Sequence, residues 1–391
     1  MDIEKFYTEV GRAVSEFTQA RPRRIVLVYH DDADGLCSGA IVKTALERKG
    51  REVEPLCLEK AYPEVIENLH SGANQVIIYS DIGSAHADFI SECNSGRNLT
   101  IILDHHDPTP STDPKVYDLN LEHHGFRGET DFSGATCNYL FARSLSERNI
   151  DLSYLALVGS REIPGDFIGP NKVILDEAEK NGVVQVQGKR IKIVKLHLSV
   201  DWLFSRLQIL GAVGYYGGGP QLGIQAATEG PTEHIRRKIG EWEKQRKAAN
   251  KRLLAQLYRE RLKETEHIQW FDAGDNYEGM GTKVIGQFCS YLSYQERLVK
   301  SDKYILGFMN VPQEIPNWGK LKELLAKVSV RVSKRLKANI DKGGKPGAAN
   351  LLSEAAKGFG IADGHDYAAN VTIPINRKDT LINNLEKAAY S

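Results

Sequence analysis

Three short stretches of the sequence each place acidic or imidazole side chains directly after an apolar run. They are VYHDDADG at residues 28–35, IYSDIGS at residues 78–84 and LDHHDP at residues 103–108. Carboxylates that are buried together without partners each cost several kcal/mol, so a cation is expected to compensate them. The simpler interpretation of any single aspartate is a helix N-cap or a turn former. We keep that interpretation for Asp31 and Asp107, since neither is needed to explain the paired acids and imidazoles.

The donor types in these stretches indicate which metal ion they would hold. Carboxylates mixed with imidazoles, without a thiolate, favour Mn²⁺, with Mg²⁺ and Zn²⁺ as alternatives. The stretches contain more acids than one ion needs, so the pattern predicts a site for two ions. Its candidate residues are His30, Asp32, Asp34, Asp81, Asp104, His105 and His106.

The elements that must position these residues alternate between strand and helix over the first 105 residues. After a helix at 3–17, short and continuous apolar runs predict strands at 24–30, 52–58, 75–81 and 99–106. Helical patterns separate them at 36–50, 62–70 and 84–93. This alternation is typical of a parallel sheet covered on both faces. Because ligands bind outside the carboxyl ends of such strands, the three stretches are expected to meet at one edge.

The rest of the chain divides into further parts. Helix is expected over 133–160, and a hairpin over 183–194 that turns at Gly188 and Lys189. The Gly-rich residues 211–231 predict a domain edge at Pro231, and residues 214–220 within them are interpreted as a hinge or loop. One long helix is expected over 232–266. We therefore predict an α/β protein with a parallel-sheet catalytic domain over 1–230, a connecting helix over 231–266 and a smaller α+β domain over 267–391.

Composition limits the function classes. The 51 Lys and Arg balance the 51 Asp and Glu, so any nucleic-acid surface must arise from local asymmetry. Residues 320–345 hold nine Lys or Arg and two acids, which suits a polyanion, although a Lys-rich solvated surface is the alternative. Five widely spaced cysteines predict reduced thiols. Early acids and the absence of an apolar run of about 20 residues predict a cytoplasmic protein with no signal peptide or membrane span.

At this point the motifs resemble those of a known family. DADG, the isolated Asp81 after a strand, and DHH resemble, in this order, the first three motifs of the DHH phosphoesterases, most closely the RecJ-type nucleases and their archaeal relatives. HHGFRGETDFSGATCNYLFARSL is similar to the segment with the SGA helix, and ALVGSREIPGD to the fourth motif, with Asp166 as its last acid. GIADGHDYAANVTIP resembles the GGHDxAAG signature of the DHH-associated domain, except that Asp363 and Asn370 replace two glycines. SVRVSK resembles the arginine strand of that domain.

The resemblance implies a role for each matching residue. Asp32, Asp34, Asp81, His105 and Asp166 would hold two Mn²⁺ ions, with His30 as a further ligand. His106 would contact the scissile phosphate and Asp104 would orient the neighbouring imidazole. In the second domain, Arg331, Gly364 and His365 would bind the substrate.

The implied function is a metal-dependent phosphodiesterase that degrades single-stranded DNA or RNA from an end by attack of metal-activated water. Two alternatives stay open. One is a nano-RNase or 3′-phosphoadenosine 5′-phosphate phosphatase that acts on short substrates. The other is a replication or repair scaffold that has lost catalysis. The implied partners are single-stranded nucleic acid and replication or repair proteins.

Overall fold

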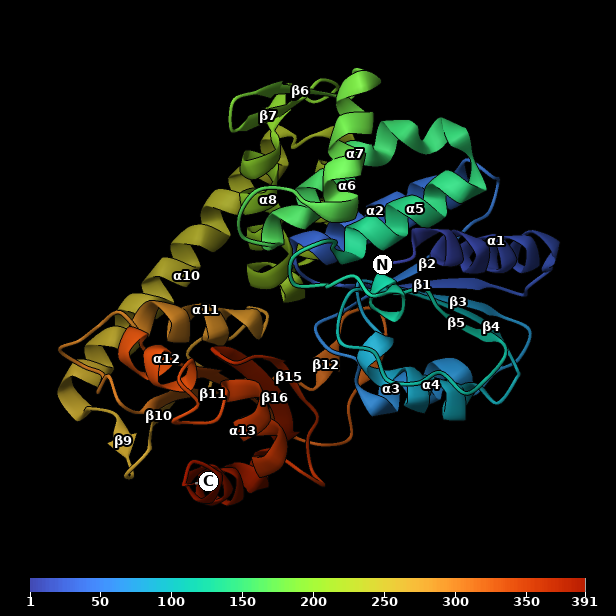
Figure 1. Ribbon diagram of the computed structural model, residues 1–391. Helices are drawn as coiled ribbons and strands as arrows, with labels where there is room; N and C mark the ends of the chain where they lie inside the picture. Colours follow the sequence, from blue (N-terminus) through green and yellow to red (C-terminus); the bar gives the residue numbers. More distant parts are fainter. Residues whose placement is uncertain (391) are drawn as a thin grey trace. The chain divides into compact units, whose positions relative to one another are not determined.

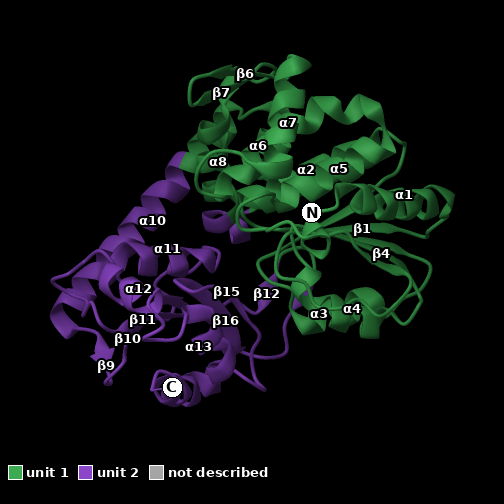
Figure 2. Cartoon of the chain, viewed as in Figure 1, with its two compact units in different colours: residues 1–211, 218–239, 316–318 green, residues 212–217, 240–315, 319–391 purple. Residues whose placement is uncertain are grey.

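The computed structural model describes residues 1–390, which form two compact units (Figure 2). Unit 1 contains residues 1–211, 218–239 and 316–318. Unit 2 contains residues 212–217, residues 240–315 and the chain from residue 319 onward. The predicted domain limits, 1–230, 231–266 and 267–391, stay predictions.

Unit 1 is built on a five-stranded sheet in the order β2-β1-β3-β4-β5, and every strand pair in it is parallel. The three central strands, β1, β3 and β4, are buried along their whole length, which explains their continuous runs of Val, Ile and Leu. The predicted parallel sheet is thereby confirmed. Its strands are β1 (Ile25–His30), β2 (Glu54–Leu58), β3 (Val76–Ser80), β4 (Leu99–Leu103) and β5 (Val116–Asp118).

Helices cover both faces of this sheet. Figure 1 shows α2 (Ala33–Glu47) and α5 (Gly134–Leu145) on one face, and α3 (Pro63–His70) and α4 (Ala87–Asn94) on the other. The remaining α-helices of this unit are α1 (Ile3–Gln19), α6 (Ser153–Gly159), α7 (Gly169–Lys180), α8 (Val200–Gln208) and α9 (Gly219–Glu229). The predicted hairpin is also present, as β6 (Val184–Gln187) and β7 (Arg190–Ile193).

Within the Gly-rich residues 211–231, the predicted hinge or loop at 214–220 forms the short 3₁₀ turn Tyr215–Gly217 and leads into α9. α9 begins at Gly219 with a proline in its first turn, so the second half of the stretch is helical. The glycine at position 223 allows close packing, since a Cβ atom there would lie 2.6 Å from Cδ1 of Leu36 on α2. Gly223 therefore brings α9 close to α2.

The predicted long helix is shorter than expected. α10 covers Glu233–Glu260, and the following Arg261 has a left-handed backbone with φ of 64°, which ends the helix. The chain then enters β9 (Lys263–Glu264) instead of continuing as helix to residue 266.

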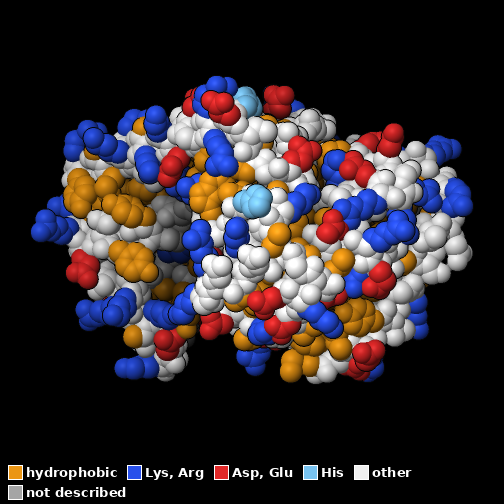
Figure 3. Space-filling view, turned by 90° about the horizontal axis from the view of Figure 1, so that it is seen from above, with side chains coloured by type: hydrophobic (Ala, Val, Ile, Leu, Met, Phe, Trp, Pro, Cys, Tyr) orange, Lys and Arg blue, Asp and Glu red, His pale blue; other side chains and the backbone are white. Residues whose placement is uncertain are grey.

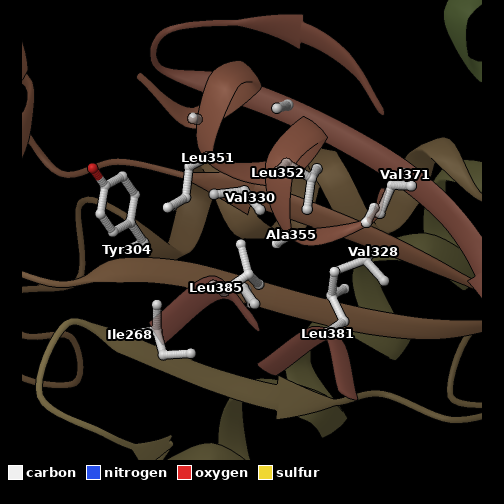
Figure 4. Close-up of a cluster of buried hydrophobic side chains, with 14 of the residues drawn as sticks. Ile268, Tyr304, Val328, Val330, Leu351, Leu352, Ala355, Val371, Leu381 and Leu385 are labelled. Atoms are coloured by element: carbon white, nitrogen blue, oxygen red, sulfur yellow. The ribbon is translucent and has the colours of Figure 1, made fainter. Parts of the chain in front are cut away.

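Unit 2 is smaller and contains a mixed six-stranded sheet in the order β15-β16-β14-β11-β10-β9, as the predicted α+β character requires. One face of the sheet packs against α13 and α14 around the apolar cluster that Figure 4 shows. The strands after β9 are β10 (Ile268–Asp272), β11 (Tyr304–Val311), β14 (Leu325–Arg331), β15 (Ala362–His365) and β16 (Ala368–Pro374). The helices are α11 (Lys283–Leu292), α12 (Lys334–Ile340), α13 (Ala348–Ala355) and α14 (Lys378–Ala388). None of the helices within residues 1–390 combines the length and apolar character that a bilayer span requires.

Candidate metal centre

The acid and imidazole side chains gather where three neighbouring strands end. His30 is the last residue of β1, Asp81 follows β3, and Asp104 follows β4. Since β1, β3 and β4 are adjacent and parallel, their carboxyl ends meet at one edge of the sheet. The backbone of Asp81 turns away with φ of 62°, and its N–H donates to the carbonyl of Leu103 at 2.8 Å. The edge predicted from the sequence is therefore formed.

Two further acids come from the first turn of α2. Asp32 is the N-cap and accepts a hydrogen bond from the backbone N–H of Gly35 at 2.8 Å. The chain passes so close here that a Cβ atom on Gly35 would lie 2.4 Å from the carbonyl oxygen of His30. The glycine of DADG is thus required by the turn that brings Asp32 beside the end of β1.

Asp34 is buried against the N-terminus of α5. Its carboxylate accepts hydrogen bonds from Ser133 Oγ at 3.1 Å and from the backbone N–H groups of Gly134 and Ala135, each at 2.9 Å. Burial raises the pKa of Asp34, while these donors favour the charged form. The positive end of the α5 dipole also favours a carboxylate here. The SGA segment therefore orients Asp34.

Asp81 has the least compensated carboxylate of the cluster. Its side chain is 1% exposed, and neither oxygen accepts a hydrogen bond from any group within residues 1–390. The closest cationic candidates are His105 Nε2, 3.5 Å from Oδ1, and His30 Nδ1, 3.6 Å from Oδ2. Burial raises the pKa of Asp81 well above its usual value, and neighbouring negative charges raise it further. A buried acid in this condition fits a metal ligand.

Two groups of potential metal ligands share Asp81. The first ligand group is His30, Asp32 and Asp81, and the second is Asp81, His105 and His106; in each group, the potential ligand atoms lie within 4.8 Å of one another. His105 Nδ1 donates to the carbonyl of Gly128 at 3.0 Å, so its Nε2 lone pair is left for a metal. Carboxylates and imidazoles in this ratio fit Mn²⁺ or Mg²⁺, and a shared Asp81 fits a pair of ions.

Asp104 forms a hydrogen bond with the imidazole of His106. Its Oδ1 lies 2.7 Å from His106 Nδ1, and its Oδ2 accepts from the backbone N–H of Ser84 at 2.9 Å. Burial alone would raise the pKa of Asp104, but the adjacent His106 outweighs burial and lowers the pKa below its usual range. Asp104 therefore remains a carboxylate that fixes the His106 ring and leaves Nε2 of that ring available.

The sequence of this region matches a family model. Residues 24–159, which carry β1 to α6 and all seven residues of the cluster, match the DHH family, N-terminal domain. This part of the chain is similar to a DHH domain. A protein of Methanocaldococcus jannaschii, recorded as uncharacterised, is 31% identical over 198 residues, or 48% of this chain and 44% of that protein.

Solved structures show the same fold over more of the chain. RecJ of Thermus thermophilus in complex with Mn²⁺ matches with a TM-score of 0.66 and 18% identity, over 98% of this chain and 55% of that chain. The same protein was also solved with Mg²⁺. CDC45 from Entamoeba histolytica matches with a TM-score of 0.50 and 9% identity, over 100% of this chain and 99% of that one. The chain thus spans about half the length of the M. jannaschii and T. thermophilus proteins.

The predicted ligand Asp166 lies outside both ligand groups. It is exposed, on a bend beyond the short helix Ser160–Glu162, and belongs to neither ligand group formed by residues 1–390. Glu162 is also exposed and also belongs to neither group, but beyond the effects of burial its charge raises the pKa of both Asp81 and His105. Asp166 therefore stays a prediction, and Glu162 is a second acid whose charge acts on the cluster.

The predicted substrate residues lie together in unit 2. His365 and Arg331 both pair with Ala368, which lies between them, so the two side chains project from the same face of the sheet. Gly364 has φ of 126°, a conformation that favours glycine. Arg331 donates to Ser290 Oγ at 2.9 Å and to two main-chain carbonyls, and no acid within residues 1–390 pairs with it. Burial lowers the pKa of this guanidinium.

Proposed function

We propose that this chain is a metal-dependent phosphodiesterase that removes nucleotides from an end of single-stranded DNA or RNA. The observation that carries the proposal is the sharing of Asp81 by two ligand groups, because a pair of ions is suited to in-line displacement at phosphorus. The fold similarity to RecJ, which was solved with Mn²⁺ and with Mg²⁺, supports the choice of these ions.

The residues of the cluster would have different roles in the reaction. His30, Asp32, Asp81 and His105 would hold the ions, with Glu162 as a further acid and Asp34 held in place by α5. When bound, the ions would lower the pKa of a water molecule and polarise the phosphoryl group. His106 lies in the second ligand group, but we assign it to the scissile phosphate, where its ring, oriented by Asp104, would stabilise the developing charge.

The second unit would bind the strand. A half-buried guanidinium with neutral partners, such as that of Arg331, suits a phosphate, and His365 projects from the same sheet face. Gly364 would shape the turn that presents His365. The basic excess over residues 320–345 adds attraction for a polyanion.

The decisive assay uses DNA and RNA strands of equal length, labelled at the 5′ or the 3′ end, with Mn²⁺, Mg²⁺ or a chelator. We expect stepwise shortening that requires a metal ion. The triple variant Asp104→Ala/His105→Ala/His106→Ala should lose activity by roughly 1,000-fold or more. Asp107→Asn, which removes an exposed neighbouring acid, is the matched control. Full cleavage by the triple variant, or no cleavage with either ion, would refute the proposal.

Two further measurements would distinguish the alternative functions, a phosphatase or nano-RNase for short substrates and a scaffold without catalysis. Much faster turnover of short oligonucleotides than of long strands would favour the nano-RNase or 3′-phosphoadenosine 5′-phosphate phosphatase alternative. The fold similarity to CDC45 and the changed residues Asp363 and Asn370 favour the replication or repair scaffold. The buried acids weigh against the scaffold, because a protein without catalysis gains nothing from them. Failure to bind Mn²⁺ at micromolar concentration would support the scaffold.

A further inference from the structure

A basic β-sheet in unit 1 is not used by the proposed mechanism. The hairpin of β6 and β7 continues into β8 (Leu198–Ser199) to form a three-stranded antiparallel sheet. Residues 183–200, which contain it, hold four Lys or Arg and no acid, although the whole protein has a net charge of zero. The four are Lys189, Arg190, Lys192 and Lys195.

The register separates an apolar face from a polar one. Val184 pairs with Ile193 and Val186 with Ile191, and these side chains are mostly buried. The alternate pairs project to the other side, since side chains opposite each other in an antiparallel ladder share a face. We call this side the basic sheet face; its residues are Gln185, Gln187, Arg190, Lys192 and Ser199. Every one of them can donate a hydrogen bond, and none carries a negative charge.

The cations of this face are uncompensated. Within the described chain, no carboxylate forms an ion pair with Arg190 or Lys192, nor with Lys189 in the turn. Lys195 donates only to the carbonyl of Thr228, at 3.0 Å. Figure 3 views unit 1 from the side on which β6 and β7 lie in Figure 1, where exposed Lys and Arg side chains are interspersed with Asp and Glu. The face thus carries positive charge that is free to act on a partner.

An aromatic side chain and two arginines extend this surface. Ser199 caps α8 by accepting from the backbone N–H of Trp202 at 3.2 Å. The indole ring of Trp202 is partly exposed, and the guanidinium groups of Arg206 and Arg236 lie 5.0 and 5.1 Å from its centroid. The adjacent acid, Asp201, is neutralised by Arg161 at 3.1 Å. Basic groups clustered with a partly exposed aromatic ring are typical of surfaces that bind single strands.

We propose that the basic sheet face and Trp202 form a second contact surface for a single nucleic-acid strand, which they bind through its phosphates without base specificity. This inference rests on the proposed function, because it assigns part of the substrate strand to a particular surface of unit 1. A polyanion complements the charge directly. An anionic membrane suits the surface less well, because the hairpin turn presents Gly188 and Lys189, where a lipid contact would require large apolar side chains.

The test compares two charge-matched double variants. Arg190→Gln/Lys192→Gln removes two cations from the basic sheet face, and Arg12→Gln/Lys49→Gln removes two exposed cations from other elements of the same unit. Binding of a labelled single strand is measured by fluorescence anisotropy over a salt series, with chelator present to prevent cleavage. Two lost phosphate contacts should reduce the slope of log K against log salt by about 1.4 and weaken binding about 25-fold near 0.1 M salt. The control should change binding less than about twofold, and turnover of short oligonucleotides should stay at the wild-type rate in both variants.

The outcomes separate this inference from the proposed function. If the wild type binds and cleaves the strand, and Arg190→Gln/Lys192→Gln binds with unchanged affinity and salt slope, the inference is wrong and the proposed function stands. If the wild type neither binds nor cleaves any strand, both fail. Binding to vesicles of phosphatidylserine and phosphatidylcholine that is lost only in this variant, with strand binding retained, would overturn the inference in favour of a membrane. Thermal melting of both variants verifies that they are folded.

Discussion

The replacement Asp81→Asn separates the stability of the metal-free protein from its response to metal. The amide keeps the shape of the side chain and, like Asp, accepts the left-handed backbone at this position. It replaces a carboxyl group that is 1% exposed and accepts no hydrogen bond from residues 1–390 with a group that cannot ionise. Burial and the neighbouring negative charges both oppose the ionised carboxylate, and the amide removes that repulsion. We therefore expect the metal-free variant to be more stable than the wild type, by about 2–4 °C in Tm for each kcal/mol in a domain of this size.

Mn²⁺ should act on the two proteins differently. At a Mn²⁺ concentration of about 100 times Kd, the wild type gains about 2.7 kcal/mol, because the ion binds only the folded state. That gain corresponds to a rise in Tm of about 5–10 °C. Asp81→Asn lacks the ligand that both groups share, so its Tm should rise by less than about 2 °C under the same conditions.

Differential scanning calorimetry of the wild type and Asp81→Asn, each with chelator and with Mn²⁺, measures the four melting temperatures. The control is Asp107→Asn, which changes an exposed acid and should behave as the wild type in both solutions. A metal-free Asp81→Asn that melts below the wild type would contradict the assignment of Asp81 as an uncompensated buried acid. An undiminished Mn²⁺ response would show that Asp81 is not a shared ligand.

Three further predictions address other residues. Glu162→Gln should weaken Mn²⁺ binding in isothermal titration by about 10–100-fold, whereas Asp166→Asn should not; the reverse result would restore Asp166 as the ligand. Burial lowers the pKa of His70 to about 4, so the stability that neutral His70 contributes is present above about pH 6.5 and is lost as the pH falls toward 4, by up to about 3 kcal/mol. Urea unfolding of the wild type and His70→Gln over this range should show that difference shrinking, and a constant difference would contradict it. Arg331→Ala should raise KM on long strands and flatten the salt dependence by about 0.7 in slope while leaving Mn²⁺ binding intact; an unchanged KM would leave Arg331 a structural residue.

The sequence predicted the sheet and most of the cluster because both depend on local signals. Strands buried on two faces read as continuous apolar runs, and the carboxyl ends of parallel strands must lie at one edge. Asp81 could be placed at that edge from a five-residue strand alone. The geometry of DADG likewise follows from a single turn. In this turn the backbone of His30 lies so close to residue 35 that a Cβ atom would not fit, and glycine is required.

The remaining features depend on contacts between distant segments. The role of the Gly-rich helix α9 follows from its packing on Leu36, about which the spacing of its glycines says nothing. Asp166 was predicted as the last acid of the fourth motif, whereas Glu162, whose charge raises the pKa of Asp81 and His105, is recognised only in the folded chain. The partner of Asp104 was also undetermined, because two adjacent imidazoles compete for it in the sequence and only the fold selects His106.

The hydrogen bonds that orient Asp34 have a consequence for synthesis of the protein. Its three donors, Ser133, Gly134 and Ala135, follow it by 99, 100 and 101 residues. A ribosome that adds about 5–20 residues per second takes roughly 5–20 s to make that span. Throughout this interval the nascent chain carries the acids that follow β1 and begin α2 without the helix that holds Asp34 in place. If the cluster holds metal ions as proposed, we expect it to reach its final geometry, and to bind them, only after α5 has been translated.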